Sequence, residues 1–161
     1  MDPRISTAEN GLRQEFVAAS RISVRLGEVA AAQERAEELQ KQIATRKAEA
    51  SGNAEVSAAL AELAHKIDEV HGAPAENEFG FFALRLPGAE PITLHKIAAA
   101  FTGLLMIVDG ADAPPAADAR AAAEKWEAAA TDVLGRWKAV DVDLAAVNAV
   151  LEKAKLQPLG K

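Results

Sequence analysis

The chain has 161 residues, enough for one domain with a buried core, and half of them are hydrophobic although only 4% are aromatic. Its net charge of -6 arises between residues 53 and 112, where nine acidic residues outnumber three basic ones, so we expect neither nucleic acid nor an anionic membrane as a partner. The absence of cysteine excludes disulfides, thiolate catalysis and cysteine-ligated zinc.

The first predicted helix extends from about residue 7 to residue 50. Ser6 and Glu9 have the spacing of a capping box, in which two side chains at a helix start bind each other's backbone N–H groups. Hydrophobic or small residues then recur mostly at steps of three and four, the period of one helical face. This predicted stripe contains Leu12, Phe16, Ala19, Ile22, Leu26, Val29, Ala36, Leu39 and Ile43. Ser51 and Gly52 follow as the predicted end of the helix.

The second predicted helix begins after Asn53, a favourable N-cap, and ends at His71 and Gly72. Residues 72–91 contain several prolines and glycines, so we expect a loop there. The loop carries a group of large apolar side chains, which we predict either to fold back on the helices or to form an interaction surface. The members of this group are Phe79, Phe81, Phe82, Leu84 and Leu86.

The third predicted helix extends from about Thr93 to Asp109 and is apolar on more than one face, which is typical of a deeply buried helix. Its longest apolar run, residues 98–108, is too short for a bilayer, which needs about 20 residues. The fourth extends from about Pro115 to Lys155, and its hydrophobic residues repeat at a spacing typical of a left-handed coiled-coil seam. The seam residues are Ala119, Ala123, Trp126, Ala130, Val133, Trp137, Val140, Leu144, Val147 and Leu151.

These four segments predict an all-α fold. We expect an antiparallel four-helix bundle with two long outer helices and two shorter middle helices, the latter lying end to end or staggered against the long pair. Residues 1–6 are then a tail, and residues 7–161 form a single helical domain that includes the loop at 72–91.

Several polar residues suggest a metal site, but each has a structural interpretation that we favour. His65 and His71 are six residues apart, so they do not share a helix face as ligands at positions i and i+4 would; we predict surface or cap histidines. Asp141 and Asp143 lack the loop glycine of a calcium site and are predicted to be solvated helix acids. Glu62, Asp68 and Glu69 could add oxygen ligands beside the histidines, and Asp132 precedes the two aspartates by a few turns.

The remaining candidates are also explained by structure. Asp109, Gly110 and Asp112 could suggest a ligand site, but we predict that Gly110 ends one helix and that Asp112 accepts hydrogen bonds at the start of the next. Trp126 and Trp137 lie three turns apart on the seam, so we predict core packing rather than a platform for a sugar ring. The sequence shows neither a nucleophile elbow nor a phosphate-binding glycine loop. We therefore predict that the chain has no catalytic residue, cofactor or metal and is not an enzyme.

Several short stretches together resemble one known family. They are residues 92–97 (ITLHKI), 108–115 (VDGADAPP), 143–148 (DLAAVN) and 156–159 (LQPL), with Trp137 and the opening residues 1–5. The pattern is similar to the C-terminal helical region of bacterial sialidase-like (BNR-repeat) β-propeller proteins, which are often labelled glycosyl hydrolases. The resemblance implies a helical tail of a larger, commonly exported protein whose active site, if any, lies in the propellers.

The expected function is a non-catalytic accessory or interaction domain. It would pack on the propeller domains of the parent protein or associate with itself through the long helices. Two alternatives stay open: a self-standing oligomeric adaptor, and a carbohydrate-binding or hydrolase-associated module that uses the two tryptophans and nearby acids.

Overall fold

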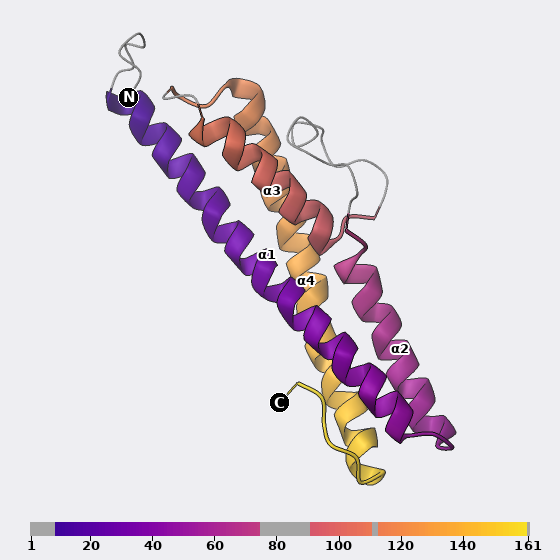
Figure 1. Ribbon diagram of the computed structural model, residues 1–161. Coiled ribbons are helices and arrows are strands. Elements are labelled where there is room, and N and C mark those ends of the chain that lie inside the picture. Colours follow the sequence, from indigo (N-terminus) through magenta and orange to yellow (C-terminus); the bar gives the residue numbers. More distant parts are fainter. Residues whose placement is uncertain (1–8, 75–90, 111–112, 161) are drawn as a thin grey trace.

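The computed structural model describes residues 9–74, 91–110 and 113–160 (Figure 1). Within these ranges the chain forms four helices and no strand: α1 (Glu9–Glu49), α2 (Ala54–His71), α3 (Leu94–Asp109) and α4 (Ala117–Lys153). The predicted all-α class is therefore confirmed for the described residues. The predicted cap residues Ser6 and Asp112 lie outside the described ranges. So do the large apolar residues of the predicted loop, Phe79, Phe81, Phe82, Leu84 and Leu86.

The two middle helices begin and end close to the residues that the sequence predicts. The backbone N–H of Val56 donates to the Asn53 side chain at 3.2 Å, which satisfies one free donor at the start of α2. Gly72 ends α2 with φ 74°, a left-handed backbone conformation that favours glycine. At the start of α3 the Thr93 hydroxyl accepts a hydrogen bond from the N–H of Lys96 at 3.4 Å.

The two long helices lie along each other, and α2 and α3 follow one another along α1 (Figure 1). Three arginines of α1 each bond a residue of α4 that lies 106 positions later: Arg21 to Glu127, Arg25 to Thr131 and Arg35 to Asp141. Because this separation is constant, α1 and α4 run in the same direction and in a fixed register. Asp141 is thus ion-paired with another helix, which the prediction of a solvated acid did not anticipate.

The core extends through all four helices. In α3 the side chains of Leu94, Ile97 and Phe101 are completely buried. Every predicted seam residue of α4 is buried except Ala123, which is half-buried. Trp126 is 8% exposed and Trp137 is 7% exposed, so both indoles belong to the core and offer little ring surface on which a sugar could stack.

One residue of the predicted stripe in α1 points outward. Phe16 is 73% exposed, whereas its neighbour Glu15 is only 9% exposed. The buried positions of α1 include a series at intervals of seven: Glu15, Ile22, Val29, Ala36 and Ile43. Phe16 lies about 100° around the helix from that series, so the register that buries the rest of α1 leaves its ring in solvent.

Candidate functional site

A hollow of about 460 Å³ lies between the N-terminal parts of α1 and α4. Its lining combines apolar side chains with charges of both signs. The lining residues are Asn10, Arg13, Gln14, Val17, Ala18, Arg21, Ile22, Pro115, Arg120, Ala123, Glu124 and Glu127. Arg21 pairs with Glu127 across the hollow, which joins the two helices there. Such a surface can pack against apolar groups and can both donate and accept hydrogen bonds.

Beside this hollow, α1 exposes three large hydrophobic residues, Phe16, Val17 and Val24, which we call the α1 patch. Their positions fall within about 100° of one another around the helix, so they share one face. Single exposed hydrophobic residues are common on protein surfaces, but several on one helix face beside a hollow are typical of an interaction surface.

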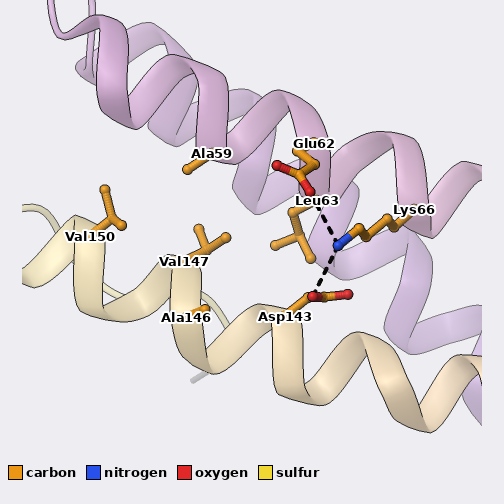
Figure 2. Close-up of a pocket in the computed structure, with 8 residues that line it drawn as sticks. All are labelled: Ala59, Glu62, Leu63, Lys66, Asp143, Ala146, Val147 and Val150. Carbon is orange, nitrogen blue, oxygen red and sulfur yellow. Dashed lines mark hydrogen bonds and ion pairs between the residues drawn. The ribbon is translucent and has the colours of Figure 1, made fainter.

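A smaller hollow of about 170 Å³ lies between α2 and α4 (Figure 2). Small and aliphatic residues form its walls, and Lys66 lies at its edge with its ammonium 3.0 Å from Asp143 and 3.3 Å from Glu62. Hydrogen bonds to Asp143 and then to Glu62 raise the pKa of Lys66. The lysine therefore stays protonated at neutral pH and cannot act as a base there. We interpret this hollow as a structural contact between α2 and α4.

The junction of α2 and α3 brings together a buried histidine, His71, and a half-buried one, His95, a pair that the sequence did not single out as a site. His71 is the last residue of α2 and is 7% exposed, so the prediction of a surface or cap histidine misses its burial. Its ring centroid lies 4.5 Å from that of His95, the second residue of α3. Gln33 of α1 contacts His95 Nδ1 at 2.9 Å. His65, by contrast, lies on the surface as predicted.

The histidine pair lies in an unusual electrostatic environment. Burial lowers the pKa of His95, and the neighbouring His71 lowers it further, while Glu37 acts in the opposite direction. The Nε2 atoms of His71 and His95 are both buried, and neither has a hydrogen-bond partner in the described part of the chain. The sequence held one indication of this pair, because both residues lie at helix ends that flank the predicted loop.

The described residues contain no group of three or more histidine, aspartate and glutamate side chains placed to hold a metal ion. None of the helices in the described ranges is long and apolar enough to cross a membrane. The candidate surface of this chain is therefore the α1 patch with its adjoining hollow, and the candidate titrating group is His95 in its contact with His71.

Comparisons with protein-family models, with curated proteins and with solved structures find no match for this chain. The likeness to propeller proteins thus stays a prediction from the sequence, and the functional argument depends on the geometry above.

Proposed function

We propose that this chain is a non-catalytic helical accessory domain that packs against another folded domain through the α1 patch. The observation that carries this proposal is the exposure of Phe16, Val17 and Val24 on one helix face beside the hollow between α1 and α4. Further along, α1 turns its large apolar residues inward, as with Val29 and Leu39. The N-terminal part of α1 thus carries apolar surface that the described residues do not cover.

The proposed partner is a propeller domain of a larger parent protein, supported by the sequence resemblance. The hollow beside the patch presents Arg13, Arg21 and Arg120 together with Glu124 and Glu127. Protein interfaces typically combine an apolar centre with a polar rim that forms hydrogen bonds in both directions. This mixture of charges suits a protein surface better than a free anion, which would require cations without competing carboxylates.

As the scaffold of this domain we propose an antiparallel four-helix bundle, in which the long outer helices α1 and α4 share one direction and the middle helices α2 and α3 run opposite to them. Contacts between α2 and α4 support it: near Ala59 of α2 lies Val150 of α4, and near Lys66 lies Asp143 (Figure 2). Residue numbers therefore rise along one helix as they fall along the other. Such a scaffold holds the α1 patch on a rigid helix rather than on a loop.

The test is a binding measurement with the neighbouring domain. The coding sequence upstream of the Met1 codon identifies that domain, and a propeller-coding segment there supplies the probe. We expect light scattering to show a complex of the chain with this propeller, and we expect the double variant Phe16→Ser, Val17→Ser to abolish it. The matched control is Val142→Ser, because Val142 is also 73% exposed but lies on α4 outside the patch.

The outcomes separate this proposal from its rivals. A wild-type chain that stays a monomer and binds no propeller fragment would remove the proposal. Binding that survives the double variant would remove the α1 patch as the contact. A melting temperature that rises with chain concentration and loses this dependence in the double variant would instead favour the self-associating adaptor, because mass action makes the stability of an oligomer concentration-dependent.

A further inference from the structure

We propose that the junction of α2 and α3 is a proton-operated hinge, in which protonation of the His71–His95 pair loosens the contact between the end of α2 and the start of α3. This inference is independent of the α1 patch and of the proposed partner. It rests on the geometry of two abutting helix ends, the hydrogen bonds of the two rings and the charges around them.

The two helix ends meet in close contact. The rings of His71 and His95 have centroids 4.5 Å apart with planes tilted by 56°. Beside them, Gly72 lies so near Thr93 that a Cβ atom added to the glycine would be 2.4 Å from the threonine hydroxyl oxygen. Because Thr93 is also the N-cap of α3, the start of that helix is fixed against the end of α2. The two rings therefore cannot move apart to reduce the repulsion of an added positive charge unless the contact between α2 and α3 opens.

The hydrogen bond to His95 requires a neutral ring. The Gln33 amide donates from Nε2 to His95 Nδ1 at 2.9 Å, which makes Nδ1 an acceptor and leaves the ring proton on Nε2. Protonation would place an N–H on Nδ1 opposite the amide N–H, so two donors would face each other until the amide turned over. The Nε2 atoms of both rings are buried without a partner in the described residues, so no acceptor there compensates an added charge.

The helix ends act oppositely on the two histidines. His71 occupies the C-terminal end of α2, where the helix dipole favours a cation. His95 occupies the N-terminal end of α3, where the dipole disfavours one. A proton on His95 is therefore opposed by the start of its own helix, and a charge on His71 would oppose it further.

Other charged groups around the junction come from all four helices. On α1, Glu37 is the carboxylate that favours a charged His95. On α2, the Asp68 carboxylate accepts a hydrogen bond from the Gln40 amide. On α3 the Lys96 ammonium donates to the carbonyl of Pro91, and on α4 Arg136 donates to the carbonyl of Ile92, so two fixed cations lie near the start of α3.

The direction of the pH effect follows from this balance. The pKa of His95 is lowered, chiefly by burial, so an open junction binds protons more readily than a closed one. The contact is then at full strength above the ordinary histidine pKa of about 6.5 and weakens as the pH falls below it. Each proton taken up on opening changes the opening equilibrium by up to about tenfold per pH unit.

The first test uses the wild-type chain, whose three histidines can be followed separately by NMR. We expect His95 to titrate at a lower pH than the ordinary histidine pKa of about 6.5. We also expect hydrogen exchange, corrected for the intrinsic rate, to show that lowering the pH from about 7.5 to about 5.5 reduces protection at residues 70–73 and 93–97 by up to about tenfold more than at Leu60 or Leu151, which is the limit for one proton taken up on opening. A uniform loss of protection, or unchanged protection at the junction, would overturn the hinge.

The second test uses matched substitutions. His95→Gln should remove most of the pH response at the junction and His71→Gln should reduce it, whereas His65→Gln on the exposed face of α2 should preserve it. A full response in both junction variants would contradict the proposal. Should a junction variant fail to fold, the wild-type titration and exchange experiments still decide the question.

Discussion

Replacing Glu15 with leucine should stabilise the protein, although glutamate is an ordinary residue in a surface helix. Glu15 is 9% exposed and occupies the same series of buried α1 positions as Ile22 and Val29. Its Oε2 atom is buried and has no hydrogen-bond partner in the described residues. A carboxylate in such a position loses water contacts without gaining a replacement.

The size of the effect follows from two contributions. Removing a buried polar group that lacks a partner relieves a cost of about 1–3 kcal/mol. Burying a leucine side chain contributes up to about 1.5–3 kcal/mol in a fully enclosed site, and less here because position 15 lies near the N-terminal end of α1. We therefore expect Glu15→Leu to raise the free energy of unfolding by about 1–3 kcal/mol, with an increase in melting temperature of about 2–4 °C per kcal/mol.

The assay is urea unfolding followed by circular dichroism, with calorimetry as a second measurement. Glu34→Leu is the matched control, because Glu34 lies on the exposed side of the same helix and its substitution should change stability by less than about 0.5 kcal/mol. A Glu15→Leu variant that is no more stable than the wild type, or that matches the Glu34→Leu control, would refute the argument that Glu15 is a buried and uncompensated charge.

Two further pairs of substitutions test the packing. Phe101→Ala should destabilise the fold by about 3–5 kcal/mol because this side chain is completely buried, whereas Phe16→Ala should change stability little; equal effects in thermal unfolding would contradict the register of α1 and α3. Gly72→Ala should cost more than Gly52→Ala, because both glycines have positive φ but only Gly72 would bring a Cβ atom against a neighbouring side chain. Equal losses in urea unfolding would show that the close contact at the junction is absent.

The proposed hinge and the α1 patch lie on different parts of the bundle. The patch and its hollow occupy the N-terminal parts of α1 and α4, whereas the histidine pair lies where α2 meets α3. Partner binding and the response to pH can therefore be measured separately with different variants. The apolar residues of the loop at 72–91 remain a second predicted surface, and those from Phe79 to Leu86 lie outside the described residues.

The sequence by itself determined the helical class, the helix ends and most of the core. The cap Asn53 acts through a bond to a residue three positions away, so a local pattern is sufficient to predict it. The spacing of hydrophobic residues likewise predicted the burial of Trp126 and Trp137, because all seam positions of one helix face the same side.

Only the tertiary structure decided which face of α1 is buried near its start and which residues meet across helices. The choice between Glu15 and Phe16 depends on the register of α1 against its neighbours, which places the carboxylate inside and the phenyl ring outside. The meeting of His71 and His95 depends on the end-to-end placement of α2 and α3, since the two residues are far apart in the chain. The physical reason is that periodicity fixes the direction of each side chain around its own helix axis, whereas register between helices is set by the packing of all their faces together.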